Sequence, residues 1–207
     1  MSQFKRIKEF EKSLTFYNQY IIDSFIQDIN GKYLHSSKHQ DFSVVSSFVG
    51  IHVSWEQFLE QSFIGYLIGE KTANKKRIKR YINPVDQSHA QEIIIGTQKY
   101  VDWANPEIVI KLCLLYFESG NPFEIILKSI KNTLLDIRTI RNSCVHLSST
   151  TSNAFNALAS RLLNKTITNM KINDLLLNID PSGNGTDTIL DTYIDTIKVA
   201  ANSISYP

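Results

Sequence analysis

Apolar residues recur at alternating steps of three and four along most of the chain. This spacing places side chains on one face of an α-helix. No stretch sustains the alternation of apolar and polar residues that marks a half-buried strand. The sequence therefore predicts an all-α fold of long and short helices. The first apolar stripe, which leads to the helix stop Asn30-Gly31, contains Phe4, Ile7, Phe10, Leu14, Tyr17, Ile21, Phe25 and Ile29.

The same period continues in further segments that are separated by turn residues. A central core helix is expected over 42–70, followed by an exposed basic segment over 71–86 that ends in a turn. A helix that begins near Pro122 should run to about Leu147, and Ser148-Ser149-Thr150-Thr151 should stop it and cap the next helix. The other expected helices cover 88–102, 106–118, 153–164 and 186–204.

Length and charge set limits on the organisation of the chain. Of the 207 residues, 43% are hydrophobic, enough for one contiguous core, so we predict a single domain over 1–207, with 186–207 as the one segment that could form a C-terminal helical appendage. Basic and acidic residues nearly balance, 22 against 20, so contact with a polyanion must come from local clusters. The sequence shows no secretory signal and no apolar run of the roughly 20 residues that cross a bilayer. We expect a cytoplasmic protein that does not enter a membrane.

Neither metal nor cofactor chemistry is predicted. Cys113 and Cys144 lie in apolar helical runs without a CxxC pattern, so each is expected to be a buried thiol rather than a metal ligand. His35 and His39 have helical ligand spacing, but the sequence offers no third ligand beside them.

The helix expected to end near Leu147 carries an arginine in an unusual place. At 100° per residue, Arg138, Asn142 and His146 form a stripe away from the core, whereas Arg141 falls at the edge of the apolar arc. A guanidinium stays charged and is costly to bury without a carboxylate, carbonyl or phosphate partner. The apolar arc consists of Ile126, Ile130, Leu134, Ile137, Ile140 and Cys144.

Each of these polar residues also has a purely structural explanation. Arg141 taken alone is better explained by a salt bridge to an acidic residue of a neighbouring helix, such as Glu56 or Glu60. His146 taken alone, near a helix C-terminus, more often caps carbonyl groups than performs chemistry. The two residues point to a function only together.

Together, Arg141-Asn142 and His146 follow an apolar helical stripe and precede Leu147-Ser148-Ser149, and this pattern resembles the Arg-x4-His signature of the HEPN superfamily. The resemblance extends to the chain length, the helical character and a preceding long helix with Val53-Ser54-Trp55-Glu56-Gln57-Phe58-Leu59-Glu60. Within the superfamily, the chain looks most like the stand-alone toxin or defence proteins related to the RiboL-PSP-HEPN group. The resemblance implies a HEPN-like antiparallel helical bundle with additional short helices. It also implies a metal-independent endoribonuclease that uses no cofactor.

The resemblance also assigns a role to each residue of the motif. His146 would act as general base or acid, because imidazole can both accept and donate a proton near neutral pH. Arg141 would bind the phosphate and stabilise the charge of the pentavalent transition state. Asn142, one helical turn from His146, would orient the imidazole or donate to the scissile phosphate. The substrate would be RNA, since only RNA supplies the 2′-OH nucleophile.

The spacing of the motif favours a dimer. Arg141 and His146 are five residues apart, so on an ideal helix they project about 140° apart with a rise of roughly 7.5 Å. One copy is therefore poorly suited to surround a single phosphate. Two copies across a two-fold axis would bring two arginines and two histidines into one groove. We expect a homodimer with a composite active site, which agrees with the dimeric sites of the family.

Weaker expectations concern RNA binding, partners and alternative functions. Lys75, Lys76, Arg77 and Arg80 of the basic segment could contact the RNA backbone, together with Arg138; a solvated loop explains the segment equally well. The resemblance to toxins adds an antitoxin or regulatory protein as a partner. The main alternative function is a non-catalytic helical module of the same fold that dimerises or binds RNA or protein. A nucleotide-binding regulator is a third hypothesis.

Overall fold

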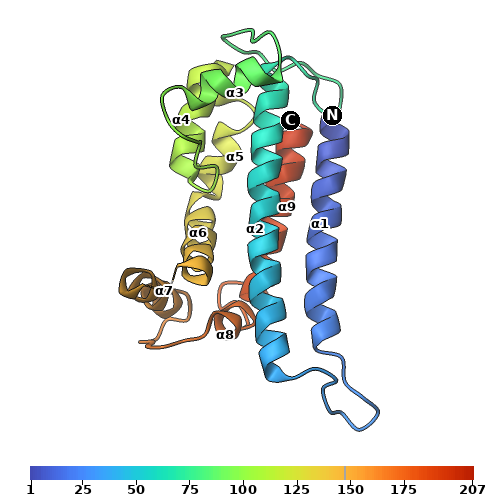
Figure 1. The fold of residues 1–207 in the computed structure, drawn as a ribbon, viewed down its shortest axis with the longest axis vertical. Helices are drawn as coiled ribbons and strands as arrows, with labels where there is room; N and C mark the ends of the chain where they lie inside the picture. Colours follow the sequence, from blue (N-terminus) through green and yellow to red (C-terminus); the bar gives the residue numbers. More distant parts are fainter. Residues whose placement is uncertain (147) are drawn as a thin grey trace. The chain divides into compact units, whose positions relative to one another are not determined.

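The computed structural model describes residues 1–146 and 148–207, which form helices, turns and isolated bridges but no β-strand. The predicted all-α fold is therefore confirmed (Figure 1). No helix within these ranges is long and apolar enough to span a bilayer. The described elements are α1 (Gln3–Ser24), α2 (Ser37–Leu67), α3 (Gln87–Ile95), α4 (Pro106–Tyr116), the 3-10 helix η1 (Glu118–Gly120), α5 (Glu124–Ser129), α6 (Lys131–Val145), α7 (Ser149–Leu162), α8 (Ile172–Leu176) and α9 (Ile189–Ser205).

The described residues group into two compact units. Unit 1 consists of Met1–Glu11, Ser54–Leu135 and Thr196–Pro207, and unit 2 consists of Lys12–Val53 and Asp136–Asp195. The helices α1, α2, α6 and α9 each contribute residues to both units. The expectation of a single domain stays a prediction, and each unit is described by itself.

Phe63 of α2 is the centre of an aromatic cluster in unit 1. Its ring centroid lies 4.9 Å from that of Phe117, 5.5 Å from that of Trp103 and 5.6 Å from that of Phe123. The rings meet edge-on or tilted, the arrangements that aromatic pairs favour. Because Trp103 precedes α4, Phe117 follows it and Phe123 precedes α5, the cluster holds α2 against this whole stretch of chain.

Buried polar side chains link the helices of unit 1 at defined positions. Arg6 of α1 is only 7% exposed, and its Nη1 donates a hydrogen bond to Glu70 Oε2 at 2.5 Å. Gln3 Nε2 donates to Ser62 Oγ of α2 at 2.9 Å and to Ser205 Oγ of α9 at 3.0 Å. These bonds offset the cost of removing the polar groups from water.

Unit 2 combines an apolar core with polar bonds between its helices. Asn173 Nδ2 of α8 donates to Asp41 Oδ1 of α2 at 2.7 Å. Arg161 of α7 forms an ion pair with Asp136 of α6 at 2.5 Å. These bonds attach α8 to α2 and α7 to α6. The buried core includes Leu14, Ile21, Val44, Phe48, Ile51, Ile137, Ile140, Phe155, Leu158, Leu175, Leu176, Leu190 and Tyr193.

The first helix is shorter than predicted. α1 ends at Ser24 instead of continuing to Asn30-Gly31. The Asp28 carboxylate accepts hydrogen bonds from backbone N–H groups in the turn that follows, among them that of Asn30 at 2.8 Å, and such bonds compete with helix formation. Ile29, the last residue of the predicted stripe, is fully exposed. Local side-chain bonding has overridden the apolar pattern here.

The single helix predicted from Pro122 to about Leu147 is divided into α5 and α6. Ile130 lies between them with φ −108° and ψ 13°, outside the helical range. The break changes which side chain of α5 faces inward, because Leu127 is fully buried while Ile126 is only partly so. Leu147 itself lies outside the described residues.

Two smaller differences also concern short helices. α3 ends before Gly96, which has φ 55°, whereas the sequence predicts a helix to residue 102. α8 has five residues, too few for a recognisable apolar period, and is not predicted. The segment 71–86 is non-helical, as expected.

Replacing Gly50 with alanine is expected to destabilise the protein. Gly50 lies within α2, and a Cβ atom built there would come within 2.3 Å of the Tyr17 ring of α1. Forcing a methyl group into a packed contact costs about 1–3 kcal/mol, of which the better helix propensity of alanine offsets up to about 1 kcal/mol. We expect Gly50→Ala to lower the free energy of unfolding in urea. Gln57→Ala, at an exposed position of α2, is the control and should change it by less than about 0.5 kcal/mol. Equal stability of both variants would show that the Tyr17 ring moves aside without a loss of packing.

Candidate active site

The residues of the proposed motif lie at the C-terminal end of α6, in unit 2. On the core side of this helix Leu134 and Ile137 are each 4% exposed and Ile140 is fully buried, which confirms this part of the predicted apolar arc. Arg141 is half-buried and His146 is exposed. The arginine therefore sits at the margin of the core, as the helical wheel predicts.

Arg141 has a polar neighbour but no counter-charge within its unit. Its Nη1 donates to Asn142 Oδ1 at 3.3 Å. Its Nε is buried and finds no hydrogen-bond acceptor among the described residues. In the described part of unit 2 no carboxylate pairs with this guanidinium. A charged donor group of this kind has unused capacity for an anionic oxygen.

The salt-bridge explanation of Arg141 concerns residues of the other unit. Glu56 and Glu60 belong to α2 in unit 1. Within that unit, Glu60 lies beside Trp103 in the lining of one cavity. A salt bridge from Arg141 to either glutamate stays a prediction.

The backbone of His146 is fixed while its side chain faces solvent. Its N–H donates to Asn142 O at 2.9 Å, which extends the helical pattern by one residue past the end of α6. Its carbonyl accepts hydrogen bonds from Thr151 Oγ1 at 2.6 Å and from Ser148 N at 3.2 Å. The imidazole is exposed and donates to no carbonyl in the part of the chain that the structure describes.

Polar contacts join the end of α6 to the start of α7. Ser143 Oγ of α6 bonds to Thr151 O of α7 at 3.1 Å, and also to Thr139 O of its own helix at 3.1 Å. Ser148 is the N-cap of α7 and forms a capping box with Thr151, which confirms the predicted stop and cap. The turn between the two helices thus holds His146 at a defined place.

Cys144 lies inside the motif but is unsuited to nucleophilic chemistry. Burial raises the pKa of its thiol to about 11, although the nearby Arg141 guanidinium acts in the opposite direction. A thiol with that pKa is almost entirely protonated at neutral pH, and the thiolate is the reactive form. Proton transfer in this motif is therefore left to His146.

The residues proposed to contact the RNA backbone belong to different units. Arg138 lies on α6 in the unit of the motif, whereas the basic segment belongs to unit 1. Within that segment Lys75 and Arg77 are exposed. Lys76 Nζ donates to Pro207 O at 2.8 Å. Arg80 is half-buried, and its guanidinium packs against Gly69, so Lys75 and Arg77 are the more accessible cations.

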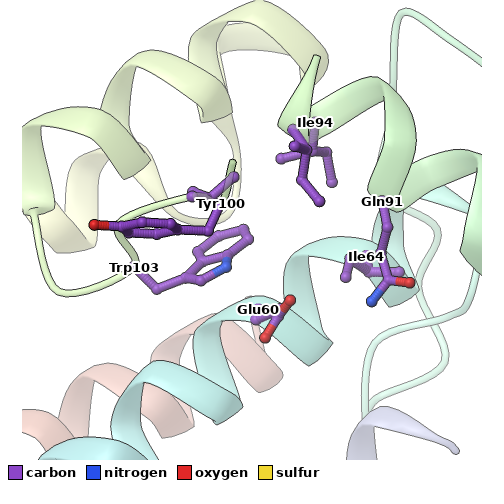
Figure 2. Close-up of a pocket in the computed structure, with 8 residues that line it drawn as sticks. Glu60, Ile64, Gln91, Ile94, Tyr100 and Trp103 are labelled. Atoms are coloured by element: carbon purple, nitrogen blue, oxygen red, sulfur yellow. The ribbon is translucent and has the colours of Figure 1, made fainter. Parts of the chain in front are cut away.

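A cavity in unit 1 has no counterpart among the sequence-based predictions. Its polar and aromatic lining includes Glu60 of α2, Gln91 of α3, and Tyr100 and Trp103 from the segment between α3 and α4 (Figure 2). Among these, only Glu60 enters the sequence-based hypotheses, as a candidate partner of Arg141. No linear motif joins residues that come from three separate segments. The one sequence feature that points to this cavity is the pair of aromatic residues Tyr100 and Trp103 between α3 and α4.

Removing the N-cap of α7 is expected to weaken the turn that holds His146. Ser148→Ala eliminates the bond from Thr151 N to Ser148 Oγ, now 3.2 Å long, and loss of such a cap costs about 1 kcal/mol. Equilibrium denaturation in urea measures the change. Ser149→Ala, one residue further and outside the capping box, is the matched control and should be nearly neutral. If both variants lose the same stability, the capping box does not hold this turn.

Comparison with models of known families, with curated proteins and with solved structures found no match. The resemblance to the HEPN superfamily therefore depends on the motif, its place on a helix and the helical character of the chain, and membership stays a prediction.

Proposed function

We propose that the protein is a metal-independent endoribonuclease of the HEPN type, with Arg141, Asn142 and His146 at its active centre. The observation that carries this proposal is the burial and incomplete hydrogen bonding of the Arg141 side chain. Its guanidinium is half-buried, and its Nε has no acceptor among the described residues. The one hydrogen-bond partner that it has among these residues is a neutral amide. A phosphate oxygen would satisfy both the charge and the unused donor.

The chemistry needs a proton acceptor, a proton donor and a cation. His146 takes the proton from the ribose 2′-OH, and the 2′ oxygen then attacks the adjacent phosphorus. Arg141 stabilises the additional negative charge of the pentavalent transition state. The bond from phosphorus to the 5′ oxygen breaks, and a second imidazole protonates that oxygen. The products are a 2′,3′-cyclic phosphate and a 5′-OH end, so atoms and charges balance without a metal.

A second protomer supplies the second imidazole in this proposal. His146 is exposed, and so is the neighbouring Val145, at 47%. A two-fold axis beside the end of α6 would place each His146 opposite the partner's motif and would cover apolar surface at the same time. The composite site of the homodimer thus combines groups that one helix projects in different directions.

Other residues have supporting roles in this proposal. The exposed Lys75 and Arg77 contact RNA phosphates, with smaller contributions from Lys76, Arg80 and Arg138. Such contacts add affinity but carry no chemistry. The biological role that follows from the resemblance is a toxin or a defence effector that cleaves cellular RNA, held silent by an antitoxin or a regulatory partner.

The purified protein is expected to cleave RNA in the presence of EDTA and to leave cyclic-phosphate ends. Arg141→Ala and Arg141→Lys should each lower the rate by roughly 10²-fold or more, because an ammonium group cannot replace the planar set of donors. His146→Ala should lower it by at least about 10²-fold. Denaturing gels of labelled RNA measure the rates, and end-group analysis identifies the products.

Two control variants separate loss of chemistry from loss of structure. His35→Ala removes another exposed histidine of unit 2, and Cys144→Ser removes the thiol inside the motif. Both should cleave RNA within about twofold of the wild-type rate. Intact RNA across structured and single-stranded substrates, with folding confirmed by circular dichroism, would reject the nuclease proposal and favour the non-catalytic module.

A mixed dimer tests whether the site is shared between protomers. Wild-type and His146→Ala chains with different affinity tags are co-expressed, and the heterodimer is isolated by two-step purification. Because the proposed reaction uses one imidazole from each protomer, this heterodimer lacks one of the two and should cleave RNA at least about 10²-fold more slowly than the wild-type dimer. A heterodimer with about half of the wild-type activity would show that each protomer works with its own imidazole alone, because a two-fold dimer has two equivalent sites.

A further inference from the structure

A cavity of about 200 Å³ opens in unit 1 beside α2 and α3. Sites for drug-sized ligands are larger, roughly 300–1,000 Å³, so its occupant would be a small molecule. In Figure 2 the aromatic rings lie on one side of the cavity and the aliphatic and amide side chains on the other, with a carboxylate at its base. The principal lining residues are Glu60, Ile64, Gln91, Ile94, Tyr100 and Trp103.

The carboxylate of Glu60 has no counter-charge among the described residues of its own unit. Burial and the nearby Glu56 raise its pKa, while a hydrogen bond from Trp103 acts in the opposite direction. No lysine, arginine or histidine in the described part of unit 1 pairs with it. One neutral donor offsets only part of the cost of holding a half-buried carboxylate. The cavity therefore has a place for a positive charge at its base.

The aromatic residues of the cavity are also suited to a positively charged ligand. Trp103 is 8% exposed and is held by an edge-to-face contact with Phe63, 5.5 Å between centroids. Tyr100 is 71% exposed and forms part of the rim. The faces of indole and phenol rings attract cations, and the aliphatic walls formed by Ile64 and Ile94 accept an apolar body.

We propose that this cavity binds a small organic ammonium ion, a protonated amine on a compact apolar or aromatic body. The ammonium group pairs with Glu60, and the Gln91 side-chain oxygen accepts a further N–H bond. The rings of Trp103 and Tyr100 contact the rest of the ligand. The site uses residues of unit 1 alone, goes beyond the proposed ribonuclease activity and does not depend on it.

Calorimetric titration of the full chain with matched probes tests the proposal. The probes are 2-phenylethylammonium, its neutral analogue 2-phenylethanol and the anion phenylacetate. We expect the ammonium ion to bind saturably, one per chain and about tenfold or more tighter than the alcohol, as expected for a hydrogen bond to a charged group. Phenylacetate should not bind. Equal affinity for the ammonium ion and the alcohol, or no saturable binding of the ammonium ion up to about 10 mM, would overturn the proposal.

Two variants identify the residue responsible for charge selectivity. Glu60→Gln keeps the size of the side chain and an acceptor for Trp103, and should reduce ammonium binding to the level of the alcohol. Glu92→Gln removes an exposed carboxylate next to Gln91 on α3, outside the cavity lining, and should leave binding unchanged. Ammonium binding that survives in Glu60→Gln would refute the assignment. If Glu60→Gln does not fold, the selectivity of the wild-type protein between the ammonium ion and the alcohol decides the question by itself.

Discussion

α2 must be surrounded by other elements, because apolar side chains cover most of its circumference. Val44, Phe48 and Ile51 are buried in unit 2, and Phe58 and Phe63 are buried in unit 1. A helix that is hydrophobic on nearly all sides is stable only when other elements remove each face from water. α1 covers part of it in both units, and the aromatic cluster around Phe63 covers another part in unit 1. The cavity of unit 1 lies beside this helix, because Glu60 and Ile64 of α2 form part of its lining.

Both candidate sites depend on a half-buried charge whose polar neighbour within its own unit is neutral. In unit 2 the Arg141 guanidinium donates to the Asn142 amide. In unit 1 the Glu60 carboxyl lies near the Trp103 indole, which acts to lower its pKa against the larger effect of burial. A single hydrogen bond to a charged group contributes about 1.5–3 kcal/mol, less than the several kcal/mol needed to remove an ion fully from water. Each charge therefore favours a ligand of opposite sign, which we propose to be a phosphate in unit 2 and an ammonium ion in unit 1.

The candidate active site is also held from outside its own helix. The imidazole of His146 is exposed. The backbone carbonyl of the same residue accepts hydrogen bonds from Thr151 and Ser148 at the start of α7. Catalysis by proton transfer depends on such positioning, because a displaced imidazole cannot reach its proton. In the proposed reaction α7 thus helps to position the imidazole, although it contributes no reacting group.

Local sequence patterns determined the helical class, the cap at Ser148 and the place of Arg141 at the edge of an apolar arc. Each of these depends on residues within a few positions of one another, so spacing along the chain is enough to reveal them. The early end of α1, the break at Ile130 and the burial of Leu127 in place of Ile126 were decided by turn bonding and packing that periodicity does not describe. The cavity around Glu60 was decided by tertiary structure alone, because three separate segments meet there and no spacing in the sequence records a meeting in space.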